Sequence, residues 1–324
     1  MEKIPDIRDL HNILVCRGEG SLGDAIISSC CYREIKKANP DAKITVACFG
    51  SAYDFFRHNP YVDEVFKLPV RRIIRPNQRW LSLFISALKL RRKNFDLVLD
   101  SSDKDFFNWR MFKWIVGGDR VLDCFTAPVQ PFGSHEEHGS KHEAAILRQL
   151  GISQPDKSYD LPILPTARAA VAQWLDEHRL HKYILFNPTG SVAPRRFKTD
   201  VLKEICAVLK SLDMPVVIPA MPSNVKELQQ AFKDTQGIFV KQTADIFELF
   251  EWVRRSALVV TPDTAVVHIA AGFEKPSLVF YNTLSAYNAP DNPKAQVLET
   301  DRADVNVFDW WKLESIVAGF KKTV

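Results

Sequence analysis

The sequence of 324 residues lacks the features that mark membrane, secreted and metal-binding proteins. It has no apolar run of the roughly 18–20 residues that a membrane-spanning helix needs. Its start, Met-Glu-Lys-Ile-Pro-Asp, is polar where a secretory signal would need an apolar core. The 6 cysteines form no Cys-x-x-Cys pair and lie mostly in apolar runs, which argues against a disulfide framework and a zinc site. These absences predict a cytoplasmic protein with reduced thiols.

Charge of either sign is not in large excess. The net charge of +4 does not indicate a general nucleic-acid binder, and 46% hydrophobic and 25% charged residues are ordinary for a globular protein. Positive charge is nevertheless concentrated at positions 71–93, which contain no acid. The bases there are Arg71, Arg72, Arg75, Arg79, Lys89, Arg91, Arg92 and Lys93. They predict a solvated face or a contact with an anionic ligand, whereas sparse aromatic residues disfavour nucleic acid.

Strand and helix patterns alternate along the chain, which predicts an α/β protein with parallel sheets. We expect strands over 12–17, 43–49, 62–67, 96–100, 183–187, 215–219, 257–261 and 277–281, and helices over 24–38, 80–92, 141–150, 200–212, 224–233, 246–255, 264–273 and 310–320. A proline-rich segment at 151–168 predicts two domains, 1–160 and 161–324. Two such halves are expected to bind ligands in a cleft between them, at the carboxyl ends of the strands.

A glycine-rich turn follows the first predicted strand. Gly18, Gly20 and Gly23 fit the Gly-x-Gly-x-x-Gly pattern of dinucleotide-binding proteins. That pattern also needs an acid at the end of the second strand to hold a ribose, but Asp41 precedes that strand. An NAD-dependent oxidoreductase is therefore the weaker alternative. Asp24 directly follows the turn, either as an acid that stabilises the helix start or as a carboxylate able to accept a proton.

The second half contains two turns that suit an anion. One helix is expected to begin with N–H groups of Thr264 and Ala265 and the Thr264 hydroxyl, which together suit a diphosphate. The alternative is an ordinary strand–helix connection with Asp263 as the N-cap. His268, one turn further, is either a packed helix histidine or a catalyst. Residues 187–198 place a hydroxyl-rich turn before three bases, which suits an anionic ligand or a solvated loop.

Taken together, these motifs resemble glycosyltransferase family 9, the bacterial heptosyltransferases of lipopolysaccharide core assembly. The matching pieces are Ser21-Leu22-Gly23-Asp24, Lys141-His142-Glu143, Thr189 with Arg195-Arg196-Phe197, and the run from Asp263 to Ala271. The resemblance implies the GT-B fold, in which two Rossmann-like, doubly wound parallel-sheet domains face each other across a cleft. A C-terminal helix that crosses back to the first domain belongs to that pattern.

The resemblance also implies an inverting transfer of heptose from ADP-heptose to a Kdo- or heptose-bearing lipid A core, with no metal and no cofactor. Asp24 becomes the general base. The donor contacts implied in the C-terminal domain are Thr189, Arg195, Arg196, Lys198, Asp263, Thr264, Ala265 and His268. The acceptor contacts implied in the N-terminal domain are Ser21, Arg71, Arg72, Arg75, Arg79, Lys141 and His142. Because this acceptor lies at the cytoplasmic leaflet of the inner membrane, a peripheral location there is expected.

Three departures from the family pattern concern the donor. Ala265 and Tyr281-Asn282-Thr283 stand where glycine and Gly-Pro-Thr are usual, and Pro188-Thr189-Gly190-Ser191 replaces a glycine–alanine motif. They leave a GT-B transferase that uses another nucleotide sugar as the alternative. A metal site at His135, His138 and His142 is disfavoured because glycine interrupts the spacing. Trp310 and Trp311 are expected to anchor the last helix by burial.

Overall fold

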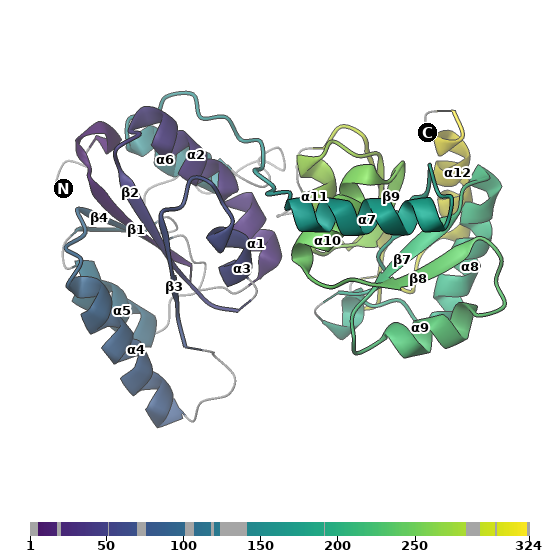
Figure 1. Cartoon of the computed structure of the whole chain (residues 1–324), viewed down its shortest axis with the longest axis horizontal. Coiled ribbons are helices and arrows are strands. Elements are labelled where there is room, and N and C mark those ends of the chain that lie inside the picture. The colour runs from purple at the N-terminus through teal and green to yellow at the C-terminus, as the bar shows by residue number, and fades with distance from the viewer. Residues whose placement is uncertain are drawn as a thin grey trace. The chain divides into compact units, whose positions relative to one another are not determined.

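The computed structural model describes residues 6–17, 21–50, 52–69, 76–100, 107–117, 120–123, 141–190, 192–282, 292–301 and 303–322. The chain divides into two compact units, Met1–Pro162 and Ile163–Val324. Each unit contains a parallel sheet with helices on both faces (Figure 1). Among these described residues, no helix is both long enough and apolar enough to span a membrane.

The sheet of the first unit has the order β3-β2-β1-β4-β5 in the described residues. Its strands are β1 (Asn12–Arg17), β2 (Lys43–Cys48), β3 (Glu64–Lys67), β4 (Leu97–Asp100) and β5 (Val121–Asp123). The chain builds outward from β1 to β3 and then returns to the other side of β1. Because all strands are parallel, β1 and β4 end at the same edge, with Cys16 opposite Asp100.

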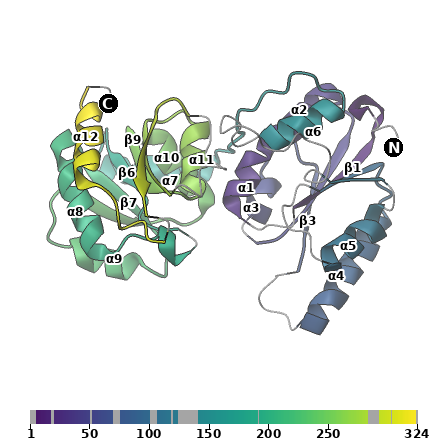
Figure 2. The ribbon, with the colours of Figure 1, turned by 180° about the vertical axis from the view of Figure 1, so that it is seen from behind.

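Helices cover both faces of this sheet. They are α1 (Leu22–Ile27), α2 (Ser29–Ala38), α3 (Ala52–Arg57), α4 (Pro76–Arg91), α5 (Phe107–Gly117) and α6 (Lys141–Gln149). Figures 1 and 2 show α2 and α6 together on one face, with α4 and α5 on the other. The helix expected over 24–38 is interrupted at Ser28, whose hydroxyl donates to the Ala25 carbonyl oxygen (3.0 Å). Such local bonding competes with the helical ladder.

The sheet of the second unit has the order β11-β10-β9-β6-β7-β8 in the described residues. Its strands are β6 (Ile184–Phe186), β7 (Val216–Ala220), β8 (Ile238–Gln242), β9 (Leu258–Pro262), β10 (Ser277–Asn282) and β11 (Ala295–Thr300). The edge strand β11 alternates polar and apolar residues, and the edge strand β8 has an apolar run of only three residues, so neither shows the long apolar run of a buried strand. The order again reverses beside the first strand, between β6 and β9.

The helices of the second unit are α7 (Pro165–Glu177), α8 (Thr199–Leu209), α9 (Val225–Phe232), α10 (Ile246–Arg255), α11 (Ala265–Gly272) and α12 (Trp310–Phe320). One face carries α7, α10 and α11, and the other carries α8, α9 and α12 (Figures 1 and 2). Helix α12 buries Leu313, Val317 and Phe320 in the core of this unit. Trp310 is partly buried there, but the expectation for Trp311 is wrong, because its side chain points away from that core and is 72% exposed.

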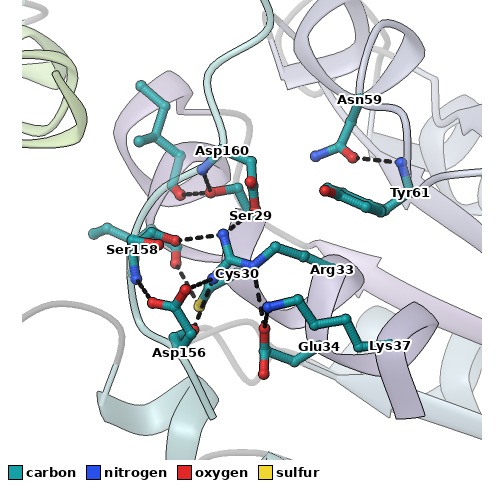
Figure 3. A network of polar contacts seen from close by, with 12 residues as sticks. Ser29, Cys30, Arg33, Glu34, Lys37, Asn59, Tyr61, Asp156, Ser158 and Asp160 are labelled. Atoms are coloured by element: carbon teal, nitrogen blue, oxygen red, sulfur yellow. Dashed lines mark hydrogen bonds and ion pairs between the residues drawn. The ribbon is translucent and has the colours of Figure 1, made fainter.

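A buried guanidinium holds the connection between α6 and α7 against the first unit (Figure 3). Arg33 of α2 donates from Nη1 to the Ser158 carbonyl oxygen (3.0 Å) and to Asp160 Oδ2 (2.6 Å). Its Nη2 donates to the Asp156 carbonyl oxygen (2.9 Å), and its Nε to Glu34 Oε1 (3.1 Å). This connecting segment forms no helix or sheet, so its carbonyl groups have no regular backbone partners. The Arg33 side chain donates to two of them and to the Asp160 carboxylate.

Arg33→Gln should lower the free energy of unfolding by about 3 kcal/mol, because it leaves buried acceptors and a carboxylate without their cation. Urea unfolding followed by circular dichroism measures the change. Arg8→Gln is the matched control, since Arg8 also contacts an aspartate and a carbonyl oxygen but is exposed. That variant should lose no more than about 1 kcal/mol. Equal losses in the two variants would contradict a special role for Arg33.

Candidate active site

In the second unit, polar residues gather where the strand order reverses. Asn187 directly follows β6, Thr261 and Pro262 end β9, and Thr264 precedes α11. Ligands of open α/β sheets bind outside the carboxyl ends of the strands at such a reversal. The topology therefore makes this edge the first candidate site, and it brings together residues that are more than 70 positions apart in the sequence.

The side-chain amide of Asn187 joins the two loops at this edge. Its Nδ2 donates to the Thr189 carbonyl oxygen (3.1 Å), to Thr261 Oγ1 (3.1 Å) and to Thr264 Oγ1 (3.2 Å). Both Asn187 and Thr261 are buried. An amide nitrogen has two hydrogens, so they are shared among three acceptors. This network fixes the loop after β6 to the start of α11.

Thr264 is the N-cap of α11, so the expectation that Asp263 takes this position is wrong. The Thr264 hydroxyl accepts from the Val266 backbone N–H (3.2 Å) as well as from Asn187. These two bonds use both lone pairs of the hydroxyl, which leaves its hydrogen for Thr261 Oγ1 at 3.2 Å or for a ligand oxygen. The helix start remains suited to an anion, because its first N–H groups have no intrahelical acceptors.

Asp263 is paired with a cation. Its Oδ2 lies 2.9 Å from Nη2 of Arg195, and its backbone N–H donates to the Phe280 carbonyl oxygen (3.1 Å). The carboxylate of Asp263 is largely buried, whereas about a third of the Arg195 side chain (37%) is exposed. A carboxylate repels a phosphate, so this geometry suits Asp263 to orienting Arg195 and Arg195 to contacting an anion.

Gly190 allows the loop after β6 to approach α11. A Cβ atom at this position would lie 2.6 Å from Cβ of Arg195, 2.8 Å from the Arg195 carbonyl oxygen and 3.3 Å from Cγ2 of Thr264. Any side chain would thus displace the backbone that carries Arg195. Arg196 supports the same loop, because its Nε donates to the Gly190 carbonyl oxygen (2.9 Å).

The remaining residues predicted for the donor lie less directly at this edge. Lys198 pairs through Nζ with Asp304 Oδ2 (3.3 Å). His268 is buried on α11, one turn beyond its start, and Ala265 is the first residue of that helix. Sequence reasoning missed Asn187 and Thr261 as site residues. Their only signal was a polar residue at or just beyond the end of an apolar strand.

In the first unit, Asp24 lies in the first turn of α1. Ser21 is the N-cap of this helix, and its hydroxyl accepts from the Asp24 N–H (3.2 Å). The same hydroxyl donates to Asp24 Oδ2. Residues 18–20 of the glycine-rich turn lie outside the described residues. Asp24 thus lies at a helix start, and its carboxylate accepts a hydrogen bond from the neutral Ser21 hydroxyl.

A buried ion pair between Arg17 and Glu143 adjoins Asp24. Arg17 ends β1, and its Nη2 donates to the Asp24 carbonyl oxygen (2.8 Å). Its Nη1 lies 3.9 Å from Oε1 of Glu143, in the first turn of α6. Burial raises the pKa of the Glu143 carboxyl; Arg17 lowers this pKa and the charge of Asp24 raises it further. Arg17 was missed in the sequence because it reads as the polar end of a strand.

A second buried ion pair lies at the same edge of the sheet. Asp100 ends β4, next to Cys16 of β1, and its Oδ2 accepts from Lys113 of α5. Both side chains are buried. The reversal point of the first unit is thus lined by carboxylates and their cations, whereas that of the second unit is lined by hydroxyls, an amide and Arg195.

Several predicted acceptor contacts lie outside the described part of the chain. They are Arg71, Arg72 and Arg75; His135 and His138 of the disfavoured metal site also lie outside the described residues. Arg79 lies on α4, and Lys141 and His142 open α6, but their side chains are also outside the description.

Two units that each contain a parallel sheet with helices on both faces are the arrangement of the GT-B fold. A family model described as "Glycosyltransferase family 9 (heptosyltransferase)" matches residues 139–306, slightly more than half of the chain. The chain therefore belongs to glycosyltransferase family 9. The expected family, fold class and enzyme class are confirmed.

Individual relatives agree with this assignment. The chain is 24% identical over 297 residues to the "Putative lipopolysaccharide heptosyltransferase 4" of Escherichia coli K12, covering 86% of this chain and 76% of that protein. The glycosyltransferase of family 9 from Veillonella parvula matches over 100% of both chains with a TM-score of 0.79 and 16% identity. The E. coli heptosyltransferase WaaC with ADP-2-deoxy-2-fluoro heptose matches over 97% of this chain and 100% of its own, with a TM-score of 0.71 and 14% identity.

Glu143→Gln should change how stability depends on pH. The pKa of Glu143 is raised in the folded protein, so its favourable contribution is complete below the unfolded pKa of about 4.3 and is lost as the pH rises through the folded value. The free energy of unfolding of the unsubstituted protein should therefore fall relative to that of the variant as the pH rises from about 4 to 7. Urea unfolding at several pH values measures this. Glu314→Gln, at an exposed carboxylate of α12, is the control. Parallel pH profiles for the unsubstituted protein and Glu143→Gln would contradict the prediction.

Proposed function

We propose that this enzyme transfers heptose from ADP-heptose to a lipopolysaccharide inner-core acceptor, with inversion at the sugar and without a metal ion. One observation carries the proposal: the Asn187 network joins Thr189, Thr264 and the start of α11 beside Arg195 in a member of a heptosyltransferase family. The names of its E. coli relatives, a putative lipopolysaccharide heptosyltransferase and a heptosyltransferase with an ADP-heptose analogue, support it.

The second unit is the proposed donor site. When the glycosidic bond to the leaving ADP breaks, negative charge grows on the diphosphate. Backbone N–H groups at the start of α11, the Thr264 hydroxyl and the Arg195 guanidinium are fixed donors that stabilise this charge. Arg196 and Lys198 are proposed to assist, and His268 to support the helix. In this proposal, cationic side chains and N–H groups stabilise the negative charge on the diphosphate, which a metal ion does in other transferases.

The first unit is the proposed acceptor site, with Asp24 as the general base. A sugar hydroxyl becomes a good nucleophile only as its proton is removed, and a carboxylate within reach can take that proton. Arg17 donates a hydrogen bond to the Asp24 carbonyl oxygen and pairs with Glu143. These two contacts fix the first turn of α1 to the buried ion pair. Ser21 is proposed to orient the base. Arg71, Arg72, Arg75, Arg79, Lys141 and His142 stay candidates for the anionic acceptor on their sequence alone.

Thr264→Val should weaken ADP binding by about 1–3 kcal/mol, because it removes a hydroxyl proposed to bind a charged oxygen. Isothermal titration calorimetry measures this, and chelation with EDTA should leave the affinity unchanged. Thr264→Ser is the matched control, since it keeps the hydroxyl that caps α11. ADP binding that is equal in the valine and serine variants would remove Thr264 from the donor site.

Asp24→Asn should reduce turnover by roughly 10²–10⁴-fold, the usual scale for loss of a general base, because an amide cannot take the proton. Donor affinity and stability should change little. The assay uses ADP-heptose with a Kdo-lipid A acceptor. Asp54→Asn removes an exposed acid from the first turn of α3 and should leave turnover unchanged. Turnover close to normal in Asp24→Asn with about 1 kcal/mol of lost stability would instead identify a structural helix acid.

A transferase with another nucleotide sugar is the second candidate. Ala265 and residues 281–283 differ from the glycine-containing sequence pattern of the family in the region proposed to bind the donor. Thermal unfolding with a panel of nucleotide sugars separates the two, because the preferred donor at 100 times its dissociation constant stabilises by about 2.7 kcal/mol. Stabilisation by NADH and not by any nucleotide sugar would overturn both.

A further inference from the structure

Helix α4 exposes a row of large apolar side chains. Leu81, Ile85 and Leu88 are 53%, 44% and 42% exposed. Their spacing of four and three residues places them on one face of the helix. The opposite face buries Leu83, Ala87 and Leu90 in the core of the first unit.

A helix that is apolar on both faces is normally covered on both. Helix α5, which packs beside α4, exposes a further large apolar side chain, Trp114, at 67%. These four residues are among nine exposed large hydrophobic residues in the described ranges. Scattered single residues of this kind need no explanation, but a row together with a tryptophan on the adjoining helix marks a surface that binds something apolar.

The charge on these two helices has one sign. Positions 76–93 and 107–117 contain no acid. Lys89 is exposed and lies four residues after Ile85 of the apolar row, and the exposed Arg92 directly follows the end of α4. Arg110 of α5 is also exposed, one turn before Trp114. The surface is therefore apolar and cationic at once.

The second unit provides a contrast. Trp311 on α12 is as exposed as Trp114, but it lies between Asp309, which caps α12, and Glu314, one turn further on. Two carboxylates and one base, Lys312, therefore lie near Trp311, so its surroundings lack the charge of a single sign found on α4 and α5. The combination on α4 and α5 is thus not a general property of exposed apolar residues in this protein.

We propose that the exposed face of α4 and α5, formed by Leu81, Ile85, Leu88, Lys89, Arg92 and Trp114, docks onto an anionic lipid bilayer. The apolar row enters the region between headgroups and acyl chains, while the bases pair with lipid phosphates. A second copy of the chain fits less well, because self-association would bring like charges together. The proposal concerns α4 and α5 and not the residues at the reversal points of the two sheets, and it does not depend on the transfer chemistry.

The first test compares two tryptophans in the full-length protein. Co-sedimentation measures binding to vesicles of phosphatidylglycerol and phosphatidylcholine, and to vesicles of phosphatidylcholine alone. The unsubstituted protein should bind the anionic vesicles, and Trp114→Ser should bind them roughly tenfold less well. Trp311→Ser, the matched control, should bind like the unsubstituted protein. Equal binding by the two variants would overturn the proposal.

The second test separates the two parts of the surface. Ile85→Ser with Leu88→Ser keeps the charge, and Lys89→Gln with Arg92→Gln keeps the apolar row. Loss of the two cations should weaken binding to anionic vesicles roughly 30-fold, at about 1 kcal/mol each. High salt should remove this difference. Each variant is first checked for an unchanged thermal unfolding midpoint, which exposed positions permit. Vesicle binding indifferent to lipid charge, or a dimer in analytical ultracentrifugation that the serine variants abolish, would overturn the proposal. These assays contain no donor and no acceptor, so failure of the proposed transfer would leave them interpretable.

Discussion

Each sheet reverses its strand order beside its own first strand, and the position of both candidate sites follows from that constraint. Parallel strands end at one edge, and at the reversal the connections after neighbouring strands leave toward opposite faces. In the second unit this opens the space that Asn187 bridges by hydrogen bonds to Thr189, Thr261 and Thr264. In the first unit it places Arg17 of β1 beside the end of β4. The sheets define where the candidate sites lie, and the helices and loops supply the polar side chains at those places.

The two edges hold different kinds of polar group, and this difference matches the two halves of the proposed reaction. The first unit buries Glu143 with Arg17 and Asp100 with Lys113, and it presents Asp24 at a helix start. Of these three carboxylates, that of Asp24 lies outside the two buried pairs, and it is the one proposed to remove the proton from a neutral hydroxyl. The second unit presents hydroxyls, backbone N–H groups and Arg195, and the Asp263 carboxylate there is paired with that arginine. Such a site suits a growing negative charge on a diphosphate.

Buried ion pairs also have a structural role outside these sites. Arg33 serves a connecting segment, where its N–H donors bind carbonyl groups that would be paired within a helix or a sheet. Arg17 serves the first turn of α1, where its two terminal nitrogens join a backbone carbonyl to a carboxylate. In both places a guanidinium is the side chain with enough donors in a fixed plane to hold several elements at once. The exposed cations of α4 contrast with these, because they lie beside apolar side chains that nothing in the described chain covers.

The sequence by itself determined the α/β class, the family and most of the strands and helices, because local periodicity and ordered motifs are properties of neighbouring residues. It predicted Asp24, Thr264 and Arg195 from their places after apolar strands. It did not show the edge strands β8 and β11, in which apolar runs are short or absent, nor the interruption at Ser28. Only the tertiary structure decided that Thr264 and not Asp263 caps α11, that Arg17 stands behind Asp24, and that Asn187 joins Thr261 and Thr264. The contacts of Asn187 join residues far apart in the chain, and the cap of α11 is a choice between two adjacent side chains. In both cases the energy depends on tertiary packing, which cannot be read from the sequence.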